Sequence, residues 1–266
     1  SASINFTNED SLNALDCALE SIVFNGPDLD EVVADPQCEA VVRKLLDHGA
    51  EAYVPESSKY GRADALGRAV SRLQDGSVVI RLLLDHGANP NPHVASQQDS
   101  PLFRAIRLGK PQTAQLLLSH GANIHDQFVS PGNPGFLGHP LQIAMEDDLY
   151  SWRGKDVRTT CLLFRLLLDQ GVDVDAPWRN GRNGLHAVAR RGLLPFAEIF
   201  LEFRPRRDSI TNALEAARAR KHWNMVKLLE NALEETSFRS EEGEDAKDEV
   251  EGSQSEDPQL QDQGNH

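Results

Sequence analysis

Three histidines recur at one place in a repeated phrase, where they could serve as metal ligands or as catalytic bases. His48, His86 and His120 each precede a Gly-Ala pair. The three copies are LLDHGA at 45–50, LLLDHGANPNP at 82–92 and LLLSHGANI at 116–124. Zinc needs its ligands about 2 Å from one centre. A fourth copy of the phrase, LLLDQGVDV at 166–174, has Gln170 in place of the His. We therefore expect no metal site here and interpret the His as a residue that ends a helix.

A second group of residues could carry out general acid–base chemistry. Its members are His139, Glu146, Asp147, Trp152 and His186. A carboxylate beside an imidazole can move protons if the geometry is suitable, and the tryptophan could form an apolar wall. The sequence contains no nucleophile motif, no phosphate-binding Gly loop and no metal-ligand set. It therefore favours a non-catalytic protein without a cofactor, with a small-molecule binder or atypical enzyme as the alternative.

The elements that would position these residues follow from a second repeated phrase. Its copies are NALDCA at 13–18, DALGRA at 64–69, SPLFRA at 100–105, HPLQIA at 139–144, NGLHAVA at 183–189 and NALEAA at 212–217. Each predicts a short helix, and the Leu-rich phrase that follows predicts a second helix with one apolar face. Ser100 is a predicted N-cap with Pro101 at the first helical position. The Gly of the other phrase suits the left-handed residue that ends a helix, and the His before it can bond the last carbonyls.

This wording and spacing resemble the ankyrin repeat, a unit of about 33 residues whose first helix begins with a TPLHxA-like phrase. SPLFRA and NGLHAVA are similar to that start, and LLLDHGANPN is similar to the family's second helix and turn. The resemblance implies an all-α solenoid of about six helix-turn-helix repeats over residues 11–235. It leaves an N-terminal extension at 1–10, and insertions at 125–138 and 146–160 depart from the pattern. The alternative acid–base pocket would lie between the third and fifth repeats.

The resemblance also implies where a partner would bind. In the family, the turn before each first helix and the two residues before its end face a concave groove. The candidate partner-binding residues at such positions are Arg72, Arg107, Phe136, Trp178, Arg179, Arg182, Arg190 and Arg191. Arg and aromatic side chains are common interface anchors, although single Arg residues can also be solvated parts of a helix surface. We therefore predict a protein-interaction module whose Arg-lined face binds a protein or peptide with acidic groups.

Charge and composition narrow the function classes further. Of the net charge of −14, −8 falls in residues 236–266, which hold ten Asp/Glu and two Lys/Arg, so we expect a disordered acidic tail there. An acidic chain is a poor match for nucleic acid, because phosphate binding needs clustered cations. No run of about 20 apolar residues predicts a membrane span. The three Cys lack a CxxC pair, and together these features predict an intracellular protein of the cytoplasm or nucleus.

Overall fold

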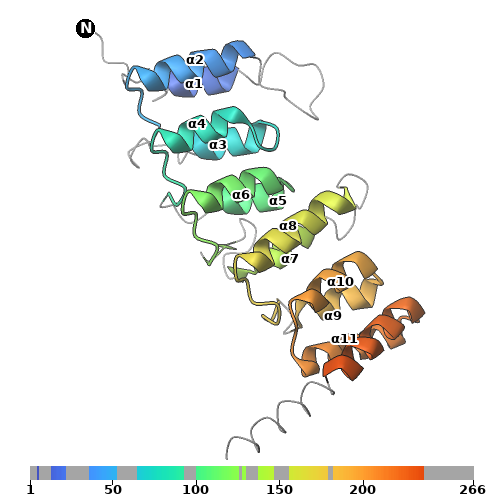
Figure 1. Cartoon of the computed structure of the whole chain (residues 1–266). Helices are drawn as coiled ribbons and strands as arrows, with labels where there is room; N and C mark the ends of the chain where they lie inside the picture. The colour runs from blue at the N-terminus through green and yellow to red at the C-terminus, as the bar shows by residue number, and fades with distance from the viewer. Residues whose placement is uncertain are drawn as a thin grey trace, which may run out of the picture.

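A computed structural model gives the architecture of most of the chain. It describes residues 5, 13–21, 36–52, 65–92, 100–125, 128–129, 137–146, 156–178 and 182–236. Within these ranges the helices form six consecutive pairs, which stack one on the next from the N-terminal to the C-terminal end (Figure 1). The predicted all-α, repeated architecture is confirmed. The predicted acidic tail lies outside the described residues, and the domain boundaries stay predictions.

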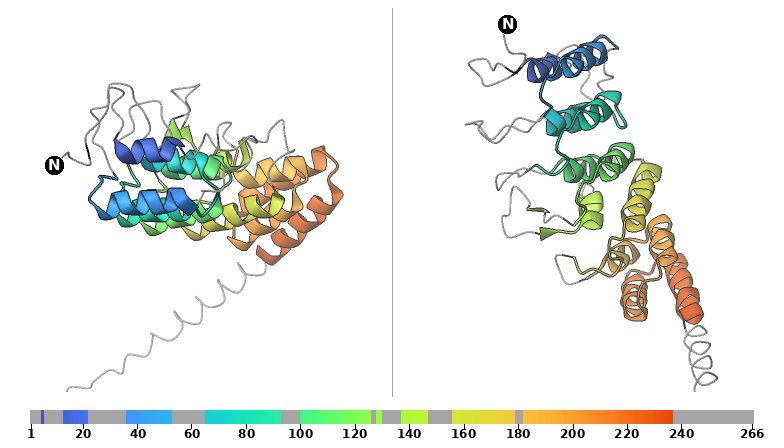
Figure 2. Two further views of the ribbon diagram at one scale, coloured as in Figure 1. Left: turned by 90° about the horizontal axis from the view of Figure 1, so that it is seen from above. Right: turned by 60° about the vertical axis from the view of Figure 1, so that its left-hand side comes forward.

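The two helices of each pair lie in two layers (Figure 2). The first layer contains α1 (Ala14–Ser21), α3 (Ala65–Arg72), α5 (Pro101–Arg107), α7 (Pro140–Glu146), α9 (Gly184–Arg191) and α11 (Arg207–Ala219). The second layer contains α2 (Pro36–Asp47), α4 (Val78–Asp85), α6 (Pro111–Ser119), α8 (Val157–Asp169), α10 (Leu194–Glu202) and a helix at 223–236. We call the outward surface of the first layer the first-helix face.

Local signals in the sequence set the helix ends as predicted. Ser100 caps α5 by accepting a hydrogen bond on its side chain from the Phe103 amide at 3.3 Å, and Pro101 follows at the first helical position. At the other end of a pair, Gly87 has φ +84°, a left-handed conformation that suits residues without a Cβ. These local signals therefore set where the helices of a pair begin and end.

Aliphatic side chains from both layers form one continuous core. The repeated Leu of the first helices are buried, as are the Ala three residues later in α3, α5, α7 and α11. Between the fourth and fifth pairs the core becomes aromatic, because Phe164 of α8 meets Phe196 and Phe200 of α10 edge-on with ring centroids 5.2 and 5.6 Å apart. Small residues in the first layer allow adjacent pairs to approach closely.

Two local features differ from the sequence-based expectation. The insertion at 125–138, expected to be a long turn, contains a short antiparallel pairing of β1 (Phe128–Val129) with β2 (Leu137–Gly138). Helix α11 begins at Arg207, five residues before the phrase at Asn212 that was expected to open it. The first-turn Asp208 accounts for this earlier start, because an acidic side chain is favourable at the positive end of the helix dipole.

Candidate functional site

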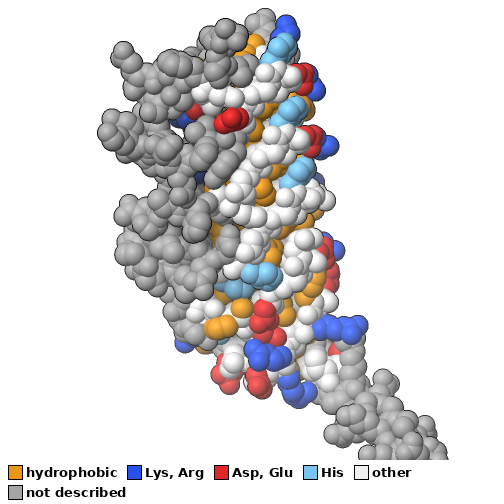
Figure 3. Space-filling model, turned by 90° about the vertical axis from the view of Figure 1, so that its left-hand side faces the viewer, with side chains coloured by type: hydrophobic (Ala, Val, Ile, Leu, Met, Phe, Trp, Pro, Cys, Tyr) orange, Lys and Arg blue, Asp and Glu red, His pale blue; other side chains and the backbone are white. Residues whose placement is uncertain are grey.

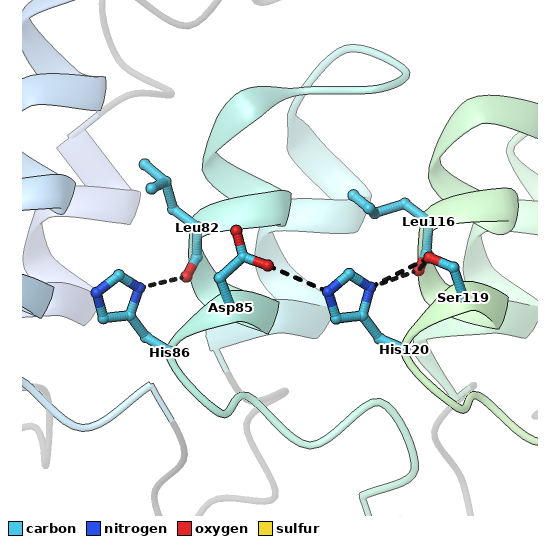
Figure 4. A network of polar contacts seen from close by, with 6 residues as sticks. All are labelled: Leu82, Asp85, His86, Leu116, Ser119 and His120. Atoms are coloured by element: carbon cyan, nitrogen blue, oxygen red, sulfur yellow. Dashed lines mark hydrogen bonds and ion pairs between the residues drawn. The ribbon is translucent and has the colours of Figure 1, made fainter.

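The repeated histidines line one side of the stack (Figure 3) and serve the helix ends, as predicted. The Nδ1 atoms of His86 and His120 lie 2.9 Å from the carbonyl oxygens of Leu82 and Leu116, four residues earlier (Figure 4). In the part of the chain that the structure describes, no group of three or more His, Cys, Asp or Glu side chains could hold a metal ion. The recurring His is a helix-ending residue whose ring bonds a carbonyl of the last helical turn.

Two arginines of the first layer hold neighbouring repeats together. Arg68 of α3 forms an ion pair with Asp16 of α1, whose side chain is buried, while that of Arg68 is largely buried. Arg104 of α5 donates to the carbonyl oxygen of Gly67 and to the hydroxyl of Ser71, each at 2.9 Å. Both arginines lie two residues after the repeated Leu of their helices. These guanidinium groups contact the neighbouring repeat inside the solenoid. In this they differ from the arginines that face solvent.

A lysine adds a similar link between the second and third repeats. Lys110 donates from Nζ to the carbonyl oxygens of Val70 and Leu73, at 2.6 and 2.5 Å, near the C-terminal end of α3. Burial lowers the pKa of Lys110, and the carboxylate of Asp75 opposes that shift. Its charge faces the negative end of the helix dipole, so it stabilises the stack.

The predicted partner-binding arginines fall into two groups by exposure. Arg72 at the end of α3 and Arg190 near the end of α9 are exposed, and neither forms an ion pair among the described residues. Arg107 and Arg191 are half-buried. Burial lowers the pKa of Arg191, and the adjacent charge of Arg190 lowers it further. Both exposed arginines lie on the last turn of a first-layer helix.

The predicted turn residues are described only in part. Trp178 is half-buried against the core, beside Gly184 and Phe200, so its ring has a packing role whatever else it contacts. Its backbone N–H donates to the carbonyl of the exposed Arg182 at 2.7 Å. Phe136 and Arg179 lie outside the described residues.

The alternative acid–base pocket is also described only in part. Asp147, Trp152 and the side chain of Glu146 lie outside the described residues. His139 precedes α7, and burial lowers its pKa while Asp173 opposes that shift. His186 lies in the first turn of α9. Burial has the largest effect on its pKa and lowers it. The hydrogen bond to the carbonyl of Asn212 raises this pKa, whereas the charges of Arg182 and Arg190 lower it. Among the described residues, no hydrogen bond joins the imidazoles of His139 and His186.

Sequence reasoning missed an exposed group at the C-terminal end of the stack. Lys221 and Trp223 are exposed. They follow Arg220, the residue that caps the C-terminal end of α11. The ring Nε2 of His222 lies 3.2 Å from the carbonyl oxygen of Arg190, which places this segment directly beside α9. The run KHW after the sixth repeat phrase was the available signal. It could be interpreted only once the two helix ends were known to be adjacent.

Comparison with known proteins assigns the family. Residues 31–127 match a family model described as ankyrin repeats, in three copies. This part of the chain consists of ankyrin repeats. A curated human relative, ankyrin repeat and SOCS box protein 2, is 37% identical over 113 residues. That match covers 42% of this chain and only 14% of the relative.

A solved structure supports the ankyrin fold. An ankyrin repeat domain from Acinetobacter baumannii has a TM-score of 0.55 at 18% identity, covering 76% of this chain and 87% of that one. The human ASB11 ankyrin repeat domain has a TM-score of 0.49 at 20% identity, covering 77% and 75%. Ankyrin repeat domains generally mediate protein–protein interactions. Among the described residues, no helix has both the length and the apolar character needed to cross a membrane.

Proposed function

We propose that this ankyrin-repeat chain is a non-catalytic interaction module whose first-helix face binds an acidic protein or peptide. The binding residues would be Arg72, Arg107, Arg190 and Arg191, which we call the arginine face. The observation that supports this most directly is that Arg72 and Arg190 are exposed at the ends of first-layer helices, with no ion pair among the described residues.

The contrast with the structural arginines supports this assignment. Arg68 and Arg104 bind groups of the neighbouring repeat, so their charges stabilise the stack. Arg72 and Arg190 have no such contact in the described chain, although the protein as a whole carries a net charge of −14. A solvated Arg costs little, but an Arg that meets a carboxylate forms a bidentate, charge-assisted pair. Acidic side chains on the partner are the chemistry that such a surface recognises.

Other residues of the face fit an interface. Leu108, which follows the half-buried Arg107, is exposed to 39%, so an apolar contact lies next to a cation. Interfaces combine such apolar contacts with Arg anchors at their centre, while the charged rim mainly raises the association rate. We place the partner along this face in the second, third and fifth repeats.

The experiment is affinity capture from native cell extract with the wild type and the Arg72→Glu/Arg190→Glu variant, with proteins and small molecules identified by mass spectrometry. A captured protein is then purified and titrated by calorimetry. We expect the variant to bind at least about tenfold more weakly, because two exposed charges are reversed. Arg81→Glu on α4, an exposed arginine of the other layer, is the control and should bind as the wild type does.

Two outcomes would contradict the proposal. Equal affinity of wild type and double variant for the purified partner would remove the arginine face from the interface. A retained metabolite with no captured protein would favour the small-molecule alternative. Thermal unfolding of each variant shows whether a loss of binding reflects a loss of folding.

A further inference from the structure

Four cations and an exposed tryptophan meet at one corner of the C-terminal repeats. The basic corner consists of Arg190, Arg191, Arg220, Lys221 and Trp223. It lies where α9 and α11 end and where the helix at 223–236 begins. The end of α9 and the turn after α11 are in direct contact, since Nε2 of His222 lies 3.2 Å from the carbonyl oxygen of Arg190.

The charges of the basic corner have no acidic partner in the described part of the chain. The carboxylate of Glu230, on the helix at 223–236, pairs with Arg218 at 2.6 Å. Arg190, Arg220 and Lys221 are exposed. Arg191 has a pKa lowered by burial and then by the charge of Arg190, so the described neighbours add positive charge to this corner.

Trp223 adds an exposed apolar surface to the charges of the basic corner. Its side chain is 66% exposed, the largest value among the exposed large hydrophobic residues of the described chain. An indole at the start of a helix, with Lys221 two residues before it, presents a flat apolar surface next to cations. Trp and Arg are the residue types that most often dominate binding at interfaces. The corner therefore suits a segment that combines carboxylates with a few apolar groups.

We propose that residues 237–266 of the same chain dock on the basic corner. This segment contains ten acidic and two basic residues, and its apolar residues include Phe238, Val250 and Leu260. The charge of −8 is opposite to that of the corner. Within an otherwise acidic chain, the corner is the described surface where unpaired cations and an exposed aromatic ring coincide.

The length of the segment permits this docking. The helix at 223–236 separates Trp223 from the start of the segment by about 20 Å, at 1.5 Å per residue. An extended chain covers about 3.3 Å per residue, so fewer than ten of the 30 residues are needed to return to the corner. Tethering on such a short linker gives an effective concentration in the millimolar range, so even a weak electrostatic contact would be occupied.

Docking at this corner would place acidic side chains on Arg190 and Arg191, which also belong to the arginine face. The acidic segment would then compete with a partner for these two residues. This competition rests on the proposed function, whereas the docking itself does not. The docking is therefore tested on the isolated full-length protein.

The test is zero-length cross-linking of the full chain with a water-soluble carbodiimide, which joins a lysine amine to a carboxylate in direct contact. Cross-linked peptides from the monomer band are identified by mass spectrometry at 20 mM salt. We expect links from Asp or Glu of residues 237–266 to Lys221 at least about tenfold more abundant than links to Lys44, an exposed lysine on α2 at the far end of the stack. At 0.5 M salt, the links to Lys221 should fall several-fold, because screening shortens the range of the attraction.

Charge variants provide the matched controls. Arg190→Glu/Arg220→Glu should lower the links to Lys221 at least about fivefold while the lysine itself is intact. Lys221→Arg removes the reactive amine but keeps the charge, so its links should disappear and identify the site. Circular dichroism of each variant shows that the repeats are still folded.

Three results would overturn the docking. Links to Lys221 and Lys44 in equal amounts would mean that the acidic segment has no preferred site. Links found only in a covalent dimer would assign the corner to a second copy of the chain. No link from the segment to Lys221 at low salt would leave the corner to an external partner, and partner binding by the arginine face would stand unaffected.

Discussion

Nε2 of His120 lies 3.2 Å from Oδ1 of Asp85, the residue before His86 in the preceding repeat. One repeat earlier, Nε2 of His86 lies 3.6 Å from Oδ1 of Asp47. The DHG phrase therefore does two things. Its His satisfies a carbonyl at the end of its own helix, and its Asp meets the His of the next repeat (Figure 4). A short motif thus connects successive repeats as well as ending each one.

We expect His120→Ala to lower the free energy of unfolding by about 1 kcal/mol, because the carbonyl of Leu116 loses a donor and Asp85 loses its partner. Urea unfolding followed by circular dichroism measures this change. A double-mutant cycle with Asp85→Ala should give a coupling of about 0.2–1 kcal/mol, as for exposed pairs. The control is His48→Ala, since His48 contacts only the Lys44 carbonyl, at 2.7 Å, among the described residues. A coupling of zero would show that the two side chains act independently.

Removing one member of the buried pair between Arg68 and Asp16 should be more costly. Arg68→Met leaves the Asp16 carboxylate buried without its cation, and we expect a loss of about 3–5 kcal/mol in the free energy of unfolding. Adding Asp16→Asn should recover part of this loss, because the amide oxygen can still accept the Asn13 N–H without carrying a charge. Chemical unfolding of both variants tests this. If the double variant is as unstable as Arg68→Met, the buried charge is not the cause.

At Gly184, α9 lies close to the side chains of its neighbours. A Cβ at this position would lie 2.4 Å from Cζ of Phe200 and 2.8 Å from Cζ2 of Trp178. We expect Gly184→Ala to lower the free energy of unfolding by about 1–3 kcal/mol, as overpacked core sites do. In a Phe200→Leu background the same substitution should cost less, since the shortest contact, to the Phe200 ring, is absent and only that to Trp178 is left. Thermal unfolding of the four proteins measures the difference, and an equal cost in both backgrounds would exclude the clash.

The half-buried His139 should make stability depend on pH. Burial lowers its pKa in the folded state below the ordinary value of about 6.5. Below 6.5 the unfolded chain binds a proton that the folded chain resists, so the free energy of unfolding falls as the pH drops from 7.5 to 5. His139→Gln should make this dependence shallower, whereas His125→Gln, at an exposed site, should not. Urea unfolding at several pH values measures both slopes, and identical slopes for His139→Gln and wild type would contradict the assignment.

The sequence by itself determined the repeated architecture, because its determinants are local. A left-handed Gly, a capping Ser before Pro, and Leu at helical spacing specify helix ends and apolar faces without reference to distant residues. For the same reason the sequence predicted that each His would bond the last carbonyls of its own helix. The early start of α11 was missed because the six-residue phrase indicates a helix but not its length.

Only the tertiary structure decided which charged residues are used inside the solenoid and which face solvent. Arg68 and Arg72 lie four residues apart on one helix, yet the first is largely buried against Asp16 and the second is exposed. That difference depends on the neighbouring repeat, because burial and ion pairing are set by packing between segments distant in sequence. The basic corner arises in the same way. Arg190 and Lys221 become neighbours only because α9 and α11 stack side by side.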